Sequence, residues 1–230
     1  LNYIKNNFKN LKYLYRFVLL PETIGSIAYL SKFYKSLKKN VICGFNLSCV
    51  GDDLSYSHIK SRNSMSLADS AITASLIGRK NVKTYSFLER GSDERQYCSP
   101  GIDLPVCGFC RSKYGTYKEY HTSLDNLNFI SEKGFTGSFD VIKNIVDSFE
   151  NGLFPKTQVK CEPFLTKYGL YPEISRKENY NDRESRLRSN LIAYSDGKTS
   201  IFDISIKIKE KLSDINKEIK KLKSKNIKKS

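Results

Sequence analysis

The sequence predicts an α/β fold followed by a small helical module. Strand-like and helix-like segments alternate through the first 110 residues, at lengths that suit a sheet with helices on its faces. Residues 155–172, rich in Pro and Gly, then precede a lysine-rich stretch with three short helical patterns. The 230 residues, 39% of them hydrophobic, suffice for one domain and a small second one.

The elements of the first domain follow from apolar spacing and composition. Aromatic and apolar runs such as YLYRFVLL and VICGFNLSCV are typical of buried strands. Apolar residues at helical spacing, with lysines between them, predict amphipathic helices. Strands are expected at residues 13–20, 41–50 and 82–87, and helices at residues 2–10, 24–39 and 66–76.

A further helix is expected at residues 138–150, with Ser138 as its N-cap and Gly152 just past its end. The Pro-rich segment after it predicts a boundary between a domain of residues 1–172 and a module of residues 173–230.

The C-terminal module is expected to contain three short helices. The first covers residues 183–194 and ends before a turn at Asp196–Gly197. Ser200 opens the second helix, and Ser213 is the expected cap of a third that runs to about Asn226. Three helices of this length resemble a helix-turn-helix or winged-helix module.

The formal net charge of +15 raises the question of nucleic acid as a partner. Lys is far more common than Arg and is spread along the chain, which is typical of a compositional bias. The basic excess gathers only at the C-terminus, where residues 175–230 hold 16 Lys and Arg against 8 Asp and Glu. The sequence therefore disfavours nucleic-acid binding by the main domain.

Other features of the sequence predict where in the cell the protein is found. No signal peptide is visible, and the longest apolar run, residues 17–21, is far short of a membrane span. A cytoplasmic protein with no membrane partner is expected, and its six cysteines are expected to be reduced thiols. Cys107 and Cys110 have zinc-knuckle spacing but lack a second pair. Met65 is the only methionine, so Leu1 is not expected to be a natural start.

Polar residues after the expected strands are the candidates for chemistry, because functional groups in open α/β sheets gather at strand ends. Glu22 follows the first strand, Asp52 and Asp53 follow the second, and His121 lies in the loop-rich region after the third. Carboxylates with an imidazole suit a hydrolytic zinc site. Each also has a plainer interpretation, as a helix N-terminal charge, a turn residue or a surface histidine.

Several long strings resemble a family of bacterial aminopeptidase-like proteins related to the co-catalytic zinc exopeptidases. The most specific are GSDERQYCSPGIDLP at residues 91–105 and YKEYHTSLDN at residues 117–126. FVLLPETIGSIA at residues 17–28 and CVGD at residues 49–52 also resemble it. CEPFLTKYGLYP and YSDGKTSIFDI resemble the approach to that family's winged helix and the winged helix itself.

The resemblance implies part of a three-layer α/β/α sandwich with a mixed sheet, and two metal ions bridged by a carboxylate. It implies that His121 is a metal ligand, that Asp52 is another, and that Glu22 is the catalytic base. A different alignment of the second strand would place Ser48 at the position of Asp52. Asp93 resembles a residue near the substrate, and Arg95 is then placed to bind a substrate carboxylate.

Two departures from the family pattern matter. Thr23 stands where the family has a second glutamate, and the family's first His ligand and bridging Asp are expected upstream of Leu1. One or two Zn²⁺ are therefore expected, held partly by residues outside this chain. The chain alone is expected to be inactive, whereas the complete protein is expected to be a metallopeptidase that hydrolyses a small peptide-like or amide substrate.

Two other functions stay open on sequence grounds. A non-catalytic descendant of the fold would bind a ligand without cleaving it, and Thr23 would mark the loss of its metal site. A DNA-binding regulator would use the last helix, with Asn216, Lys217, Lys220 and Lys221 for phosphates. The sequence also allows a homo-oligomer.

Overall fold

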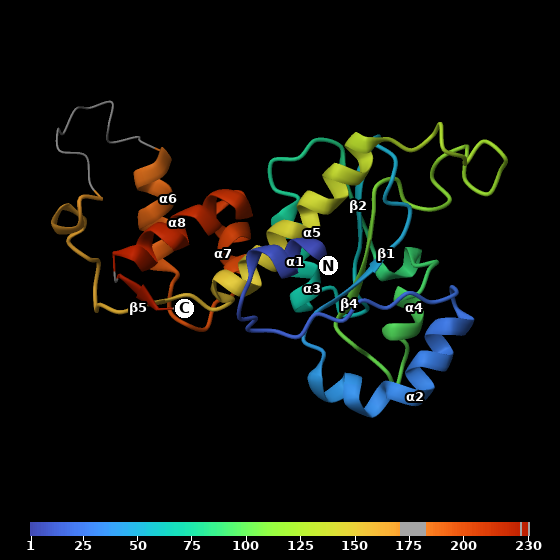
Figure 1. Ribbon diagram of the computed structural model, residues 1–230, viewed down its shortest axis with the longest axis horizontal. Helices are drawn as coiled ribbons and strands as arrows, with labels where there is room; N and C mark the ends of the chain where they lie inside the picture. Colours follow the sequence, from blue (N-terminus) through green and yellow to red (C-terminus); the bar gives the residue numbers. More distant parts are fainter. Residues whose placement is uncertain (171–182, 226, 230) are drawn as a thin grey trace. The chain divides into compact units, whose positions relative to one another are not determined.

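A computed structural model describes residues 1–170, 183–225 and 227–229. It divides into two compact units (Figure 1). Unit 1 comprises Leu1–Tyr13 and Asn144–Ser230, and unit 2 comprises Leu14–Lys143. The predicted domain boundary between residues 172 and 173 lies outside the described residues, and it stays a prediction.

Unit 2 is built on a four-stranded mixed sheet with the strand order β1-β4-β2-β3. The strands are β1 (Gly44–Leu47), β2 (Tyr56–Ile59), β3 (Val82–Tyr85) and β4 (Val106–Cys110). β1 runs parallel to β4 and β2 runs parallel to β3, whereas β2 and β4 are antiparallel. This sheet confirms the predicted α/β class and its mixed strand directions.

Helices cover both faces of this sheet (Figure 1). They are α2 (Ile24–Asn40), α3 (Leu67–Ser75), the short α4 (Glu94–Tyr97) and the first part of α5 (Glu132–Gly152), which continues into unit 1. One apolar cluster joins α2 to the loop before β4 through Leu30, Leu37, Cys98, Leu104 and Val106. The predicted helices at 24–39 and 66–76 and the predicted strand at 82–87 are confirmed.

The expected strand at residues 13–20 is wrong. In the structure this stretch has no strand pairing, and Leu14 and Leu19 are 87% and 96% exposed. An apolar run predicts burial, but a strand also needs a neighbouring backbone to pair with. Two strands of this sheet were not predicted: β2, with its polar residues Ser57 and His58, and β4, which contains both cysteines of the knuckle-like spacing.

Unit 1 contains the helices α1 (Asn2–Asn7), α6 (Arg183–Ala193), α7 (Ile201–Ile208) and α8 (Leu212–Ser224). A two-stranded antiparallel sheet pairs β5 (Lys156–Thr157) with β6 (Lys228–Lys229). The largest fully buried side chains of the unit are apolar and belong to α6, α7, α8 and the second part of α5: Ile145, Leu191, Ile201, Phe202, Ile204, Leu212, Ile215, Ile219 and Leu222.

The helix ends differ in part from the prediction. Ser200 is the N-cap of α7, as expected, and its hydroxyl accepts a hydrogen bond from the backbone N–H of Asp203. Ser213 lies inside α8, whose N-cap is Lys211. Ser138 likewise lies inside α5, where its hydroxyl donates to the carbonyl of Val50 instead of capping a helix.

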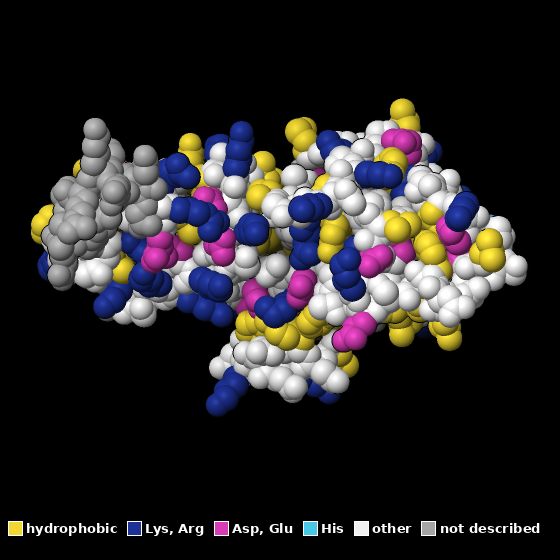
Figure 2. Space-filling view, turned by 90° about the horizontal axis from the view of Figure 1, so that it is seen from above, with side chains coloured by type: hydrophobic (Ala, Val, Ile, Leu, Met, Phe, Trp, Pro, Cys, Tyr) yellow, Lys and Arg dark blue, Asp and Glu magenta, His cyan; other side chains and the backbone are white. Residues whose placement is uncertain are grey.

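No helix in the described ranges of the chain is long and apolar enough to cross a membrane. On the face shown in Figure 2, the Lys and Arg side chains are interspersed with acidic and apolar ones. This face is therefore not uniformly basic, as a surface that binds a nucleic-acid backbone would be.

Candidate functional site

The turn that precedes α2 places Glu22 and Thr23 beside the loop that leads into α4. The Thr23 backbone N–H donates to Oδ1 of Asp93 at 2.7 Å, and the Arg95 guanidinium donates to Oγ1 of Thr23 at 2.8 Å. The structure thus brings together four neighbours: the Glu22–Thr23 pair, Asp93 and Arg95. The side chains of Glu22 and Arg95 are exposed, so a ligand can reach both.

Thr23 is held in a strained conformation, with φ 63° and ψ −68°. A β-branched residue is rarely found at positive φ, and such strain persists only where surrounding contacts hold it. Here those contacts are the hydrogen bond that Thr23 donates to Asp93 and the one that it accepts from Arg95. Residues held in this way cluster at functional sites, which marks this turn as the best-defined part of the candidate site.

His121 is exposed and also has a positive φ, 58°. Its ring stacks on that of Tyr120, with ring centroids 4.0 Å apart and planes 17° apart. Tyr120 in turn packs against the cluster of Ile59, Cys110 and Tyr114. Burial raises the pKa of Tyr120, and the neighbouring Cys49 and Glu22 raise it further. The Glu22 carboxylate therefore acts electrostatically on Tyr120, whose ring stacks on that of His121.

Glu94 is a residue of this region that sequence reasoning missed. Its carboxylate is fully buried and accepts hydrogen bonds from Tyr114 Oη at 2.6 Å, Asn46 Nδ2 at 2.7 Å and the backbone N–H groups of Gly91 and Ser92. Burial alone would raise the pKa of Glu94, but these hydrogen bonds outweigh burial and the pKa is lowered. Glu94 therefore positions the loop that carries Asp93 and Arg95.

Asp52 lies after β1, where the strand-end rule placed it, but its carboxylate is already engaged. It accepts hydrogen bonds from the backbone and hydroxyl of Ser112, at 2.9 Å and 2.7 Å, and from the backbone of Leu54 at 3.1 Å. Only 2% of Asp52 is exposed. Asp53 instead forms an exposed ion pair with Lys133 at 3.2 Å. Zinc binding by Asp52 stays a prediction.

The predicted zinc ligands do not meet at one point. In the part of the chain that the structure describes, one group of three or more His, Cys, Asp or Glu side chains has its ligand atoms within 4.8 Å of one another. That group does not include Glu22, Asp52 or His121. By themselves, these residues do not fit a zinc centre, so a catalytic zinc site also stays a prediction.

The last helix, α8, differs from the expectation for a DNA-contacting helix at one residue. Asn216 is only 5% exposed, and its amide donates to the hydroxyl of Ser148 at 2.9 Å, so it is not available to phosphates. Lys221 is ion-paired with Glu184. Lys217 and Lys220 remain exposed on α8.

Two family models match this chain, one after the other. A family model described as "Domain of unknown function (DUF4910)" matches residues 2–152, and one described as "winged helix-turn-helix" matches residues 153–229. A Clostridium acetobutylicum protein, named as a candidate polysaccharide biosynthesis protein with an aminopeptidase-like domain, is 37% identical over 202 residues. That match covers 85% of this chain and 45% of the relative.

A solved structure is also similar to this chain. The crystal structure of a candidate peptidase from Clostridium acetobutylicum superimposes with a TM-score of 0.75 at 31% sequence identity. The match covers 91% of this chain and 46% of the other, so the chain spans about half the length of the relatives it matches. Its fold is thus that of a peptidase-like relative, and the chain belongs to the DUF4910 family, with a winged helix-turn-helix module after the family domain.

Proposed function

We propose that this chain contributes the substrate-facing part of a zinc-dependent, aminopeptidase-like hydrolase of small peptide or amide substrates. The names of the two relatives, an aminopeptidase-like domain and a candidate peptidase, support the family-level activity. We also propose that the protein is related to the co-catalytic zinc exopeptidases and shares their three-layer sandwich. Helices on both faces of the mixed sheet agree with that architecture.

The observation that carries the proposal is the strained Thr23 turn and the two residues that hold it. In this arrangement the exposed carboxylate of Glu22 is the candidate base, because a general base must reach a water molecule at the substrate. Arg95 uses one of its five N–H donors for Thr23. The remaining donors suit a bidentate contact with a substrate carboxylate.

The test uses the complete protein that contains this chain, assayed with aminoacyl amides and small peptides. We expect Glu22→Gln to lower kcat by roughly 10²- to 10⁴-fold, the usual contribution of a positioned base. Glu132→Gln, which changes an exposed carboxylate in the first turn of α5, is the matched control. Equal activity of the two variants would remove Glu22 from the reaction.

The same assay separates catalysis from ligand binding without cleavage. Arg95→Met should raise KM more than it lowers kcat if Arg95 binds the substrate carboxylate. A protein that binds peptides in an Arg95-dependent way but hydrolyses none would be a ligand-binding descendant of the fold. The absence of a second carboxylate at Thr23 favours that alternative.

DNA binding is a second candidate function, favoured by the winged helix-turn-helix match and by the exposed Lys217 and Lys220 on α8. Replacing both with Gln should remove up to about two phosphate contacts. The dependence of retention on salt concentration, measured on duplex DNA, should become correspondingly less steep. The charge-matched control is Lys35→Gln with Lys39→Gln on α2. A retention that is the same in all three proteins would exclude α8 as the contact.

A further inference from the structure

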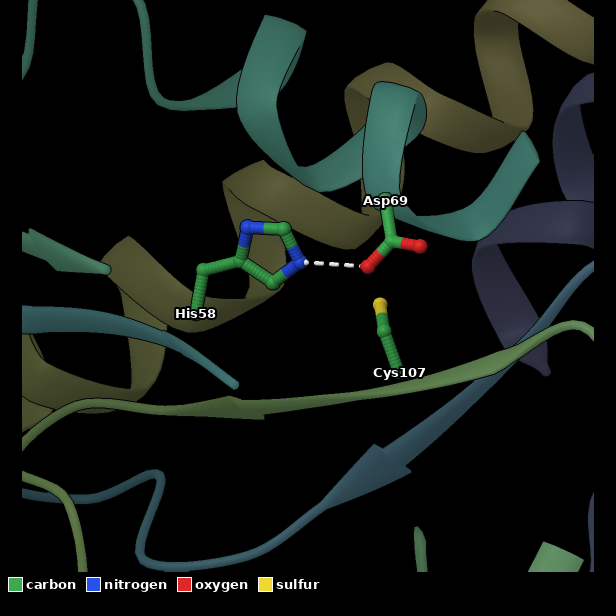
Figure 3. Close-up of side chains that lie close together, drawn as sticks. All are labelled: His58, Asp69 and Cys107. Atoms are coloured by element: carbon green, nitrogen blue, oxygen red, sulfur yellow. Dashed lines mark hydrogen bonds and ion pairs between the residues drawn. The ribbon is translucent and has the colours of Figure 1, made fainter. Parts of the chain in front are cut away.

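A second group of polar side chains lies in unit 2, buried between the sheet and α3, and the proposed hydrolase does not use it. It consists of His58 from β2, Asp69 from the first turn of α3, and Cys107 from β4 (Figure 3). One ligand atom from each lies within 4.8 Å of the other two. The residues are 1%, 3% and 0% exposed, so water does not compete for them.

The sequence brings these residues together through strand register and helix capping. His58 is opposite Phe109 in the antiparallel pair of β2 and β4, and Cys107 is two residues from Phe109 along β4. Because side chains alternate across a strand, His58 and Cys107 point to the same face of the sheet. Asp69 reaches that face from above, as the third residue of α3 in a capping box with Ser66.

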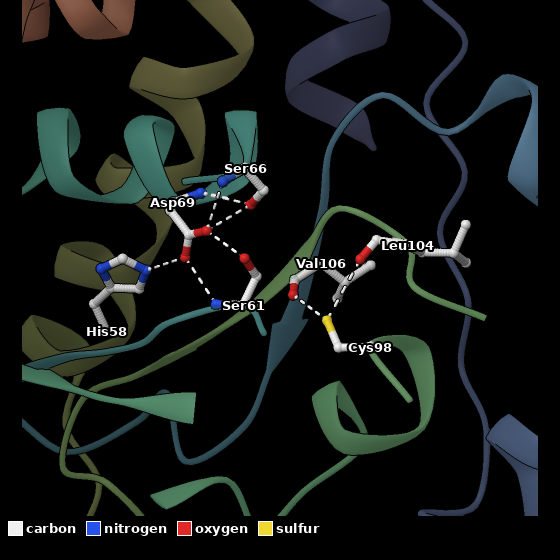
Figure 4. A network of polar contacts seen from close by, with 7 residues as sticks. All are labelled: His58, Ser61, Ser66, Asp69, Cys98, Leu104 and Val106. Carbon is white, nitrogen blue, oxygen red and sulfur yellow. Dashed lines mark hydrogen bonds and ion pairs between the residues drawn. The ribbon is translucent and has the colours of Figure 1, made fainter. Parts of the chain in front are cut away.

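The Asp69 carboxylate is fixed in orientation. It accepts hydrogen bonds from the backbone and hydroxyl of Ser61 and from the backbone and hydroxyl of Ser66 (Figure 4). Its Oδ1 also faces His58 Nε2 at 3.1 Å. Outer hydrogen bonds of this kind orient the carboxylate ligands of protein-bound metals.

The His58 ring is satisfied at one nitrogen only, since its Nε2 pairs with Asp69 Oδ1. Nδ1 of His58 is buried with no hydrogen-bond partner among the described residues. The Cys107 thiol is fully buried beside Asp69. The Cys107 sulfur therefore lies beside a pair formed by His58 Nε2 and Asp69 Oδ1, and all three atoms are types that bind transition metals.

We propose that His58 Nε2, Asp69 Oδ1 and Cys107 Sγ bind one divalent transition-metal ion, with zinc as the preferred ion. Imidazole nitrogen, carboxylate oxygen and thiolate sulfur are all zinc ligands, and this mixture distinguishes zinc from calcium or magnesium. Two ligands at the usual zinc bond length of about 2.0–2.1 Å lie about 3.3 Å apart in a tetrahedron. The observed 3.1 Å between Nε2 and Oδ1 is close to that spacing.

Cys43 lies on the same side of the sheet, but its sulfur is not one of the atoms of this group. Phe45 is opposite Cys107 in the parallel pair of β1 and β4, and Cys43 lies two residues before Phe45, on the same face of the sheet. Burial, and then the negative charge of Asp69, raise the pKa of the Cys43 thiol. The three ligands come from β2, α3 and β4, so a bound ion would tie these three elements together.

Binding has a defined proton balance. The Cys107 thiol loses its proton to solvent and forms a bond from sulfur to the ion, whereas His58 binds through its neutral ring. The site shares no residue with Glu22, Asp93, Arg95 or His121. It is therefore independent of the proposed hydrolase, and either can fail without the other.

The test is cobalt binding to the chain, refolded with Co²⁺ after removal of metal. A thiolate ligand gives an intense sulfur-to-cobalt charge-transfer absorption, which oxygen and nitrogen ligands do not give. We expect one Co²⁺ per chain with this absorption, displaced by one Zn²⁺. Cys107→Ser should lose the absorption, whereas Cys98→Ser should keep it.

Cys98→Ser is a matched control because Cys98 is an equally buried thiol of the same unit. Its sulfur donates to the carbonyls of Leu104 and Val106 (Figure 4), contacts that a serine hydroxyl can also make. Bound cobalt without thiolate absorption in the unaltered chain would overturn the proposal, and so would absorption that persists in Cys107→Ser.

Two further measurements keep the test decisive. If Cys107→Ser does not fold, as judged by circular dichroism, the unaltered chain alone decides through the presence or absence of the absorption. His58→Asn should then remove the rise in Tm that Zn²⁺ gives the unaltered chain, and an equal rise in both would overturn the proposal. Glu22→Gln should leave the absorption unchanged, which separates this site from any metal of the proposed hydrolase.

Discussion

A buried carboxylate shows how single residues stabilise this protein. Glu94 has no exposed surface, and four donors, from Tyr114, Asn46, Gly91 and Ser92, surround its two oxygens. A charge is stable in such a place only when donors replace the lost water. Because these donors come from β1, the Gly91 loop and Tyr114, the carboxylate joins three segments that are distant in sequence.

Glu94→Gln should lower the free energy of unfolding by about 2–4 kcal/mol at neutral pH. The amide side chain brings two donors to a place already filled with donors, and it removes the charge that strengthens the hydrogen bonds. Urea unfolding monitored by circular dichroism measures the loss. Glu162→Gln, at an exposed glutamate, should change stability by less than about 0.5 kcal/mol.

The same residue makes stability depend on pH. The pKa of Glu94 is lowered in the folded state, so the unfolded chain takes up a proton at higher pH than the folded one. The contribution of Glu94 is therefore complete above the ordinary pKa of about 4.5 and is lost as the pH falls through the folded value. We expect the stability difference between the unaltered chain and Glu94→Gln to shrink between pH 6 and pH 3. A constant difference would contradict this assignment.

At the scale of elements, the beginning of α5 depends on a glycine. A Cβ at Gly134 would overlap the carbonyl oxygens of Gly51 and Asp52, because the first turn of the helix passes directly against that loop. Within an exposed helix, Gly→Ala stabilises by about 1 kcal/mol. Here the sign should reverse, and Gly134→Ala should destabilise unit 2 by about 2–4 kcal/mol.

Thermal unfolding of Gly134→Ala, compared with Lys133→Ala, measures this effect. Lys133 is the preceding residue of the same helical turn, and its exposed ion pair with Asp53 contributes little. An increase in stability for Gly134→Ala would show that the helix leaves room for a methyl group beside the carbonyl oxygens of Gly51 and Asp52.

In unit 1, α6 and α8 are joined by a buried ion pair. Arg188 Nε lies 2.5 Å from Glu218 Oε1, and the two residues are 3% and 4% exposed. Arg188→Leu should cost about 3–5 kcal/mol, because it leaves the Glu218 charge buried and unpaired. Arg188→Leu with Glu218→Leu should recover much of that loss, and Arg186→Leu, at an exposed arginine of α6, should cost little. The free energies of unfolding of the unaltered chain and these three variants, measured by chemical denaturation, test this prediction.

The sequence predicts elements well where a local signal and a tertiary role agree. The helix at 24–39 and the Ser200 cap follow from spacing and capping, and both are confirmed. The strand at 13–20 was wrong because composition does not supply a pairing partner. β2 was missed because His58 and the serine before it are polar, although they are buried in the sheet by long-range pairing.

At the scale of the whole molecule, strand order decides which of the predicted site residues meet. Local strings identified Glu22, Asp93 and Arg95, and the structure places them around Thr23. No local pattern predicts that His58, Asp69 and Cys107 converge, because their approach depends on the long-range pairing of β2 with β4. The spacing of Ser66 and Asp69 was the one available signal, since it is that of a capping box.

Residues 14–24, which end at the first residue of α2, affect how the molecule behaves in solution. Leu14, Phe17, Leu19 and Ile24 are 87%, 59%, 96% and 77% exposed, within eleven consecutive residues of the chain. Apolar surface of this extent favours association, because burying it releases about 25 cal/mol per Å². We expect the chain to self-associate as its concentration rises, which sedimentation velocity measures.

Leu14→Gln with Leu19→Gln should shift that association to higher concentration without lowering the Tm, because neither side chain is part of the core. Leu88→Gln with Leu127→Gln is the matched control, since these leucines are also exposed, at 84% and 83%, but lie in other loops. If both double variants reduce association equally, general surface hydrophobicity is the cause. An effect confined to the first pair assigns the contact to residues 14–24, directly next to the Glu22–Thr23 turn, and self-association should then also shield the Glu22 carboxylate from solvent.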